Sequence, residues 1–157
     1  MPHFSTTKRV GVSAELVYRV VADVGAYRDF LPLLQRSHIR GDKRLVKDVE
    51  IFDAELVVAY DKLGLREAFV SRVTCDPHMQ EVKATSAEGI FHSMQTVWSI
   101  KPAGTASNVT VTIDYALRNP LLQFAVAGAM GMAVDKIMLA FEQRAKNLSA
   151  VGIQAQA

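Results

Sequence analysis

Two side chains in this sequence, Glu67 and His92, could begin an acid–base pair inside a fold. Each lies in a strand-like segment, in the same alternating phase as apolar neighbours, so either could point inward. General acid–base catalysis needs such groups within hydrogen-bond reach of a substrate. A lone histidine is more often a satisfied core residue, and a glutamate near a strand end usually leaves toward solvent. We therefore expect no catalytic residue and no enzyme activity.

Motifs for nucleophiles, phosphates or metals are missing from the sequence. It has no GxSxG, no HExxH and no P-loop, and its four histidines are not spaced like metal ligands. The single cysteine, Cys75, excludes a disulfide framework and a four-cysteine zinc site. We expect no metal, no catalytic cofactor and an inert thiol.

The charge balance is mild: 18 basic and 16 acidic residues give a net charge of +2 over 157 residues. DNA-binding domains usually carry a much stronger basic field, so we expect no DNA partner. The first ten residues, MPHFSTTKRV, lack the apolar core of a signal peptide. The expected location is cytoplasmic, with peripheral contact at the inner membrane as a further expectation.

An apolar stretch, Phe30-Leu31-Pro32-Leu33-Leu34, follows a predicted helix. Five such residues exceed what a connecting loop needs, and exposed apolar patches often mark binding sites. The stretch could form the rim of a ligand site, or it could tuck under a sheet as ordinary core. The residues alone leave both interpretations open.

The C-terminal region is also unusually apolar. The segment PLLQFAVAGAMGMAV is apolar on nearly every face of a helix, whereas a surface helix shows one stripe. Its small residues leave space, and its methionines suit adaptable apolar pockets. It could be a cavity wall with a second apolar side, or a tightly packed core helix. The run Leu121–Val134 is shorter than the roughly 18–20 residues of a membrane span.

A basic segment runs beside the apolar loop. RSHIRGDKRLVK contains Arg36, Arg40, Lys43, Arg44 and Lys47 with a single aspartate. Such charges next to apolar residues suit an anionic membrane surface or ribosomal RNA. The alternative is the solvated face of two edge strands. The charges favour the ribosome only if they converge on one face.

The periodicity predicts one domain over residues 1–150 and a disordered tail at 151–157. A strand over 3–12 precedes a helix capped by Ser13 and ended by Gly25, and a second short helix follows at 26–31. Period-two segments between turn signals then indicate a meander of strands, short turns favouring antiparallel pairing. Asn119-Pro120 opens a helix that reaches about Ala150. We predict an α+β fold in which a curved antiparallel sheet of about six or seven strands wraps a long helix.

Several segments together resemble the coenzyme Q-binding branch of the START-like, or polyketide cyclase-like, superfamily, which includes the ribosome association toxins. They are VVADVGAYRDFLP, AELVVAY, FVSRVTCDP, EGIFHSMQTVWSIKP, IDYALRNPLL and MLAFEQRA, covering about residues 3–148. The resemblance implies a helix-grip fold, an apolar tunnel, a bound ubiquinone or similar lipid, and a non-enzymatic role in quinone delivery to respiration. Where relatives tend to have Trp-Cys, this chain has Leu33-Leu34.

A ligand site follows from combining this resemblance with the residue pattern. The expected mouth is Val20, Tyr27, Phe30, Leu31 and Pro32; the sheet side is Leu56, Val58, Tyr60, Phe69, Met94, Trp98, Ile113 and Tyr115; the helix wall is Met130, Val134 and Met138. Tyrosine hydroxyls are expected to orient a quinone carbonyl. Leu33, Leu34, Arg36, Arg40, Lys43, Arg44 and Lys47 are expected to contact a membrane or ribosome. The rival functions are a ribosome-binding inhibitor of subunit association and a cyclase or hydrolase of polyketide-like substrates.

Overall fold

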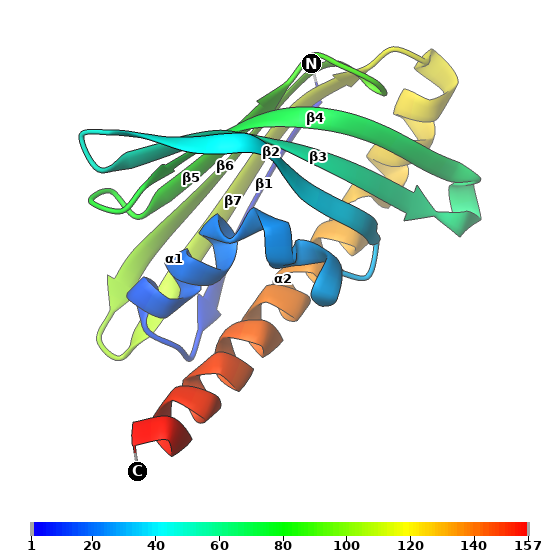
Figure 1. Ribbon diagram of the computed structural model, residues 1–157. Helices are drawn as coiled ribbons and strands as arrows, with labels where there is room; N and C mark the ends of the chain where they lie inside the picture. Colours follow the sequence, from blue (N-terminus) through cyan, green and yellow to red (C-terminus); the bar gives the residue numbers. More distant parts are fainter. Residues whose placement is uncertain (1, 157) are drawn as a thin grey trace.

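A curved antiparallel sheet wraps one long helix in the computed structural model, which describes residues 2–156 (Figure 1). The strands are β1 (His3–Val10), β2 (Leu34–Val46), β3 (Val49–Tyr60), β4 (Leu65–Asp76), β5 (Glu81–Ser86), β6 (Phe91–Ala103) and β7 (Ala106–Leu117). The helical segments are α1 (Ala14–Ala22), η1 (Val24–Asp29), η2 (Asp61–Leu63) and α2 (Pro120–Gln156). The predicted α+β architecture is confirmed.

The seven described strands follow the order β1-β7-β6-β5-β4-β3-β2, and every neighbouring pair is antiparallel. β2 to β7 form the meander expected from the turn signals, and the last strand, β7, also pairs with the first strand, β1. The basic β2 is consequently an edge strand. One face of the sheet curves over α2, and α1 with η1 closes one end (Figure 1).

α1 begins as predicted but ends earlier. The Ser13 Oγ accepts a hydrogen bond from the Leu16 N–H at 3.4 Å, and the Asp23 N–H closes the last turn on the Arg19 carbonyl. Gly25 lies inside η1, so the predicted helix end at Gly25 is wrong. The Ser37 hydroxyl of β2 donates to the Gly25 carbonyl at 2.9 Å, a tertiary contact that no local signal reveals.

The Asn119 Oδ1 caps α2 by accepting hydrogen bonds from the N–H groups of Leu121 and Leu122. The helix continues through Gln156, past the expected end near Ala150, so it overlaps the expected tail; residue 157 lies outside the described residues. By length and composition alone, the stretch Pro120–Ala150 could cross a membrane, and only 17% of its most apolar window is buried. Our sequence estimate, which considered only the run Leu121–Val134, was therefore too short.

Buried apolar side chains form two clusters along the concave face of the sheet. The larger cluster joins α1, the middle of the sheet and the second half of α2, and it includes Val21, Trp98 and Phe141. The smaller cluster lies nearer the start of α2 and includes Phe69 and Tyr115. Half-buried residues such as Leu56, Ile113 and Met130 touch both clusters. The space between sheet and helix is not completely filled, and this space is the candidate site.

Candidate functional site

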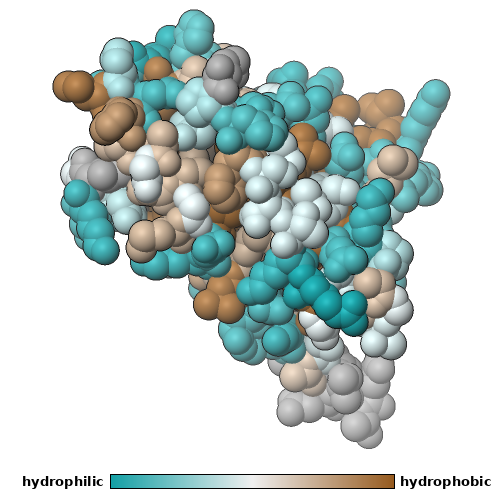
Figure 2. Space-filling model, turned by 180° about the vertical axis from the view of Figure 1, so that it is seen from behind, coloured by the Kyte–Doolittle hydropathy of each residue, from teal (hydrophilic) through white to brown (hydrophobic). Residues whose placement is uncertain are grey.

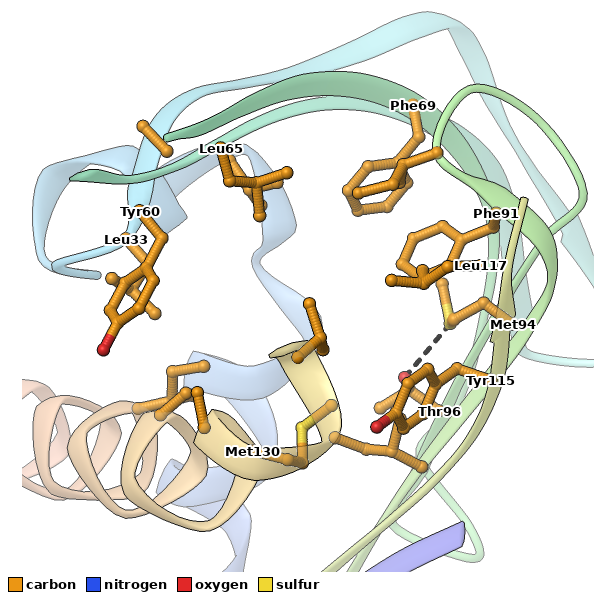
Figure 3. Close-up of a pocket in the computed structure, with 18 residues that line it drawn as sticks. Leu33, Tyr60, Leu65, Phe69, Phe91, Met94, Thr96, Tyr115, Leu117 and Met130 are labelled. Carbon is orange, nitrogen blue, oxygen red and sulfur yellow. Dashed lines mark hydrogen bonds between the residues drawn. The ribbon is translucent and has the colours of Figure 1, made fainter. Parts of the chain in front are cut away.

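A cavity of about 300 Å³, the outer chamber, lies between the sheet and the first half of α2 (Figure 3). Side chains from three directions surround an open centre: the β3–β4 hairpin with Leu33, the strands β6 and β7, and the helix. The lining residues are Leu33, Val58, Ala59, Tyr60, Leu65, Phe69, Ile90, Phe91, Met94, Thr96, Ile113, Tyr115, Leu117, Val126, Ala129, Met130, Ala133 and Ile137.

A second cavity of about 210 Å³, the inner chamber, extends from the outer chamber toward η1. The chambers adjoin because both are lined by Phe69, Met94, Thr96, Ile113 and Ile137. The inner chamber is completed by Val24, Tyr27, Leu31, Leu34, Leu56, Ser71, Val73, Val82, Ala84, Trp98, Val111, Val134 and Phe141, most of which are buried. The two chambers therefore adjoin across these five shared side chains, and both have apolar walls.

Small residues on α2 keep the outer chamber open. Ala129 and Ala133 face it on either side of Met130, so the helix approaches the sheet without filling the gap. Larger side chains at these positions would occupy the space, as Phe141 does farther along the helix, where its ring lies 4.8 Å from the ring of Trp98. Ala129 and Ala133 therefore line a cavity rather than a tight helix–sheet contact.

A β-bulge in β6 decides which side chain enters the outer chamber. The register shifts between Phe91 and Ser93, so Phe91 faces the cavity while His92 is exposed. Alternation continued back from Met94 placed His92 inward, and the bulge reverses that assignment. The Phe91 ring contacts the Phe69 ring edge-to-face at 4.9 Å.

The loop before β6 is held by backbone contacts. Gly89 has a φ of +61°, and a Cβ at this position would collide with the backbone oxygen of Ala68. The Arg118 guanidinium donates hydrogen bonds to the carbonyls of Gly89 at 3.1 Å and Ala87 at 2.9 Å. These contacts fix the wall formed by Ile90 and Phe91.

No charged side chain is among the residues that line the two chambers. Glu67 shares the phase of Leu65 and Phe69 but is exposed near the strand end, and His92 is exposed at the bulge. Among the described residues, no group of three or more histidine, cysteine or acidic side chains is placed to hold a metal. The cavity therefore offers an apolar surface and a few hydroxyls rather than an acid–base pair.

The hydroxyl groups of the chambers differ in what they can donate. The Tyr27 hydroxyl donates to the backbone carbonyl of Val21, and burial raises the pKa of Tyr27. The Thr96 hydroxyl donates to the Met94 sulfur at 3.2 Å (Figure 3). Burial also raises the pKa of Tyr115, whose ring faces the outer chamber. Tyr27 has therefore committed its proton to Val21, whereas Tyr60 and Tyr115 also line the cavity, and the contact between a tyrosine hydroxyl and a quinone carbonyl stays a prediction.

Twelve of the sixteen predicted ligand residues line the cavity, and their binding role stays a prediction. The outer chamber includes Val58, Tyr60, Tyr115 and Met130; the inner chamber includes Tyr27, Leu31, Leu56, Trp98 and Val134; both include Phe69, Met94 and Ile113. All eight residues of the predicted sheet side are among them. Strand alternation was sufficient there because those residues share one face of a regular sheet.

Four predicted ligand residues lie elsewhere. Val20 and Met138 belong to the packed core around α1, which covers that end of the helix. The Phe30 ring contacts the Phe141 ring at 5.3 Å and lies beneath the Arg144 guanidinium, outside both chambers. Pro32 is exposed. Three of the five residues of the predicted mouth, and Met138 of the predicted helix wall, therefore lie outside the two chambers.

The residues expected to contact a membrane or ribosome fall into two groups. Leu33 lines the outer chamber and Leu34 lines the inner chamber, and both are half-buried, so their contact with a membrane or ribosome stays a prediction. Arg36, Arg40, Lys43, Arg44 and Lys47 are exposed on or next to the edge strand β2.

The basic side chains of β2 do not converge on one face. Lys43 lies 4.7 Å from the centre of the Phe52 ring. Arg40 pairs with Glu55 at 2.7 Å, and both Arg40 and Arg44 lower the pKa of Asp53, although Arg72 contributes most. Since Phe52 and Asp53 are adjacent in β3, they face opposite sides of the sheet, and so do the cations beside them. Lys43 therefore lies on the other face of the sheet from Arg40, and contact of this segment with a ribosome or membrane stays a prediction.

Several lining residues were not named as ligand residues from the sequence. They are Ala59, Leu65, Ile90, Phe91, Thr96, Leu117, Val126, Ala129, Ala133 and Ile137 in the outer chamber, and Val24, Ser71, Val73, Val82, Ala84, Val111 and Phe141 in the inner chamber. Leu65, Ile137 and Phe141 carried a usable signal, because each continues an apolar phase of its strand or helix. Thr96 shares the phase of Met94 and Trp98, and Ser71 shares that of Phe69 and Val73, but their polar side chains gave no reason to name them as ligand residues.

Comparison with known proteins gives a consistent set of matches. A family model described as "Polyketide cyclase / dehydrase and lipid transport" matches residues 10–142. The coenzyme Q-binding protein COQ10 homolog B, mitochondrial, of Xenopus laevis is 31% identical over 90% of this chain, which spans 57% of that relative's length. The ribosome association toxin RatA of Rickettsia prowazekii is 25% identical over 94% of this chain and 99% of its own. A START superfamily protein from Mycobacterium smegmatis shares the fold with a TM-score of 0.79 at 23% identity, over 93% of this chain and 98% of its own.

Proposed function

Because this chain belongs to the polyketide cyclase/dehydrase and lipid transport family, we propose that it binds a ubiquinone in its cavity and delivers it for respiration. The observation that carries the proposal is the pair of adjoining apolar chambers between the sheet and α2. The outer chamber, about 300 Å³, lies at the lower end of the range of small-molecule sites, and the inner chamber adds about 210 Å³. Such sites are mostly apolar with a few oriented polar groups. The similarity to a protein named for coenzyme Q binding supports the choice of ligand.

Binding of this kind is driven by the removal of apolar surface from water. Each Å² of buried apolar area contributes about 25 cal/mol, before the cost of ordering the ligand. An isoprenoid tail extending through the outer chamber would contact the aromatic rings of Phe69 and Phe91 and the thioether of Met130. The cavity walls are suited to retaining a lipid without covalent chemistry.

Delivery requires exchange with a bilayer, and we place the contact on the free face of α2. Leu121 and Phe124 are each 84% exposed, and Met132 is 60% exposed. Hydrophobic side chains reach the surface at the end of the molecule where α2 begins (upper left in Figure 2). Val126 and Met130 of the same helix line the outer chamber, so a ligand could pass from bilayer to cavity along an apolar path.

The proposal is tested by extracting the purified protein with organic solvent and identifying any lipophile by mass spectrometry. Ubiquinone is then titrated into the protein while the fluorescence of Trp98, the single tryptophan, is followed. Trp98 lines the inner chamber, so an occupying quinone should quench it. A clean extract together with no response to added ubiquinone would end the carrier hypothesis.

A ribosome-binding role is the second candidate, and it is favoured by one observation. The relative named as a ribosome association toxin matches this chain over nearly its whole length. Co-sedimentation with ribosomal subunits separates the two roles. Replacing Arg40, Lys43 and Arg44 with glutamine should flatten the salt dependence of pelleting if β2 contacts RNA. Ribosome pelleting with no lipid binding would favour this role over the carrier.

A cyclase or hydrolase of polyketide-like substrates is the third possibility raised by the family. It needs a buried acid–base pair next to the substrate, and the candidates Glu67 and His92 are exposed outside the chambers. Glu67→Gln and His92→Gln should leave ubiquinone binding unchanged.

A further inference from the structure

Ser71 is an unusual residue in the wall of the inner chamber. It lies on β4 between Phe69 and Val73, and all three residues line the chamber. Ser71 is only 1% exposed, and its Oγ has no hydrogen-bond partner in the described structure. A buried hydroxyl without a partner is costly, about 1–3 kcal/mol, so such a group calls for an explanation.

Packing does not explain why a hydroxyl is present here. Ser71 pairs across the sheet with Ala54, which is completely buried, and the surrounding wall is apolar. An alanine at position 71 would present the same surface without the buried polar atom. The hydroxyl gains a partner only when something with a hydrogen-bond acceptor enters the chamber.

The other hydroxyls of the inner chamber have already donated their protons. Tyr27 donates to the Val21 carbonyl, and Thr96 donates to the Met94 sulfur. Among the described residues that line the inner chamber, Ser71 is therefore the one whose hydroxyl proton is uncommitted.

Building on the proposed function, we propose that Ser71 is the polar anchor of the site. Its hydroxyl donates a hydrogen bond to an oxygen of the ligand's head group, which occupies the inner chamber, while the isoprenoid tail extends through the outer chamber toward α2. The ligand class is accordingly a lipid with a compact, oxygen-bearing head, such as a quinone, rather than a plain hydrocarbon.

The chain contains a matched control in Ser107. Its Oγ is the second buried hydroxyl without a partner, and Ser107 is completely buried. It lines neither chamber. Ser71→Ala and Ser107→Ala therefore remove the same group from the same kind of environment, but only the first removes it from the cavity.

The test measures binding of two ligands to the wild type and both variants. Ubiquinone affinity comes from Trp98 fluorescence, and squalene, an isoprenoid without oxygen, is measured by competition and extraction. Ser71→Ala should weaken ubiquinone binding roughly three- to tenfold, the effect of one lost hydrogen bond, and leave squalene binding unchanged. Ser107→Ala should change neither. Both variants should keep or raise the melting temperature, because each removes an unpartnered group.

Contrary results are distinguishable. Equal ubiquinone affinity in the wild type and Ser71→Ala, or equal losses for ubiquinone and squalene, would overturn the anchor while leaving the carrier function intact. A marked drop in melting temperature for Ser71→Ala would mean that the hydroxyl stabilises the empty fold, which also contradicts the anchor. A wild type that binds neither ligand would overturn the proposed function, and the anchor with it.

Discussion

The hydroxyl of Tyr27 in η1 donates its hydrogen bond to the backbone carbonyl of Val21 in α1. The ring meanwhile contacts Phe30 and Phe141 edge-to-face and lines the inner chamber. This one side chain therefore fastens the end of α1 to η1 and also closes the cavity. Its hydroxyl supports the fold rather than donating to a ligand.

Tyr27→Phe should lower the free energy of unfolding by about 1 kcal/mol, because the buried Val21 carbonyl loses its side-chain donor. Chemical denaturation measures the loss. Tyr60→Phe is the control: Tyr60 is only half-buried, and its change should stay within about 0.5 kcal/mol. Equal effects of the two variants would contradict the supporting role of the Tyr27 hydroxyl.

Met130→Trp should block the outer chamber. Its larger side chain would fill existing space, so the melting temperature should change little while ubiquinone binding falls tenfold or more, about 1.4 kcal/mol. Binding is measured by extraction after gel filtration, because the new tryptophan would confuse the Trp98 signal. The control is Met132→Trp, on the exposed side of the same helix, which should bind ubiquinone as the wild type does. A large stability loss with unaltered binding would place Met130 in plain core, where overpacking costs about 1–3 kcal/mol.

Gly89→Ala should destabilise the protein more than Gly104→Ala. Both glycines have positive φ, +61° and +66°, so the conformational penalty is shared. Only at Gly89 would the added Cβ collide with the backbone of Ala68, whereas nothing lies within 4 Å at Gly104. Thermal unfolding compares the two variants. Equal melting temperatures for the two variants would show that β4 moves away from the added methyl group without a loss of stability.

Cys75 should make stability fall at alkaline pH. Burial, with a smaller contribution from Glu50, raises the pKa of Cys75 to about 12. The unfolded thiol ionises near pH 8.5, so above that pH the unfolded state releases a proton that the folded state keeps. The contribution is complete below about pH 8.5 and is lost as pH rises toward 12.

The check is denaturation of wild type and Cys75→Ala at several pH values. The difference in free energy of unfolding between wild type and variant should be constant up to about pH 8. Between about pH 8 and pH 10 the wild type should lose stability relative to the variant. The comparison ends near pH 10, because tyrosines also titrate above it. Folded Cys75 should also resist alkylation at pH 8 until denaturant is added. Rapid labelling of the folded protein would contradict its burial.

Phe124→Ser combined with Leu121→Ser should weaken co-sedimentation with liposomes, because both side chains are exposed on the apolar face of α2. Their exposure also means that the melting temperature should change little. The double variant Leu45→Ser with Val46→Ser is the control, since these residues are exposed at the end of β2, away from the cavity walls. If only the control variant lost liposome binding, the membrane contact would lie on the β2–β3 hairpin.

The sequence by itself determined the order of elements, the cap of α2 and the eight residues of the sheet side. Period-two alternation needs only a regular strand, and Asn119-Pro120 acts within one turn of the helix it starts. The α+β fold class followed from this order of elements, and the resemblance added the helix-grip assignment. The structure agrees with both because those local patterns admit few ways to cover one apolar sheet face.

Tertiary structure alone decided where the empty space lies. Met130 and Met138 are alike in type and helix face, yet one lines the outer chamber and the other is packed by α1, because their distance along α2 sets which element faces them. A bulge turned Phe91 inward and His92 outward. The lack of a partner for Ser71 likewise depends on residues distant in the chain. Cavities and unpaired groups are properties of packing between elements, and periodicity within one element carries no information about them.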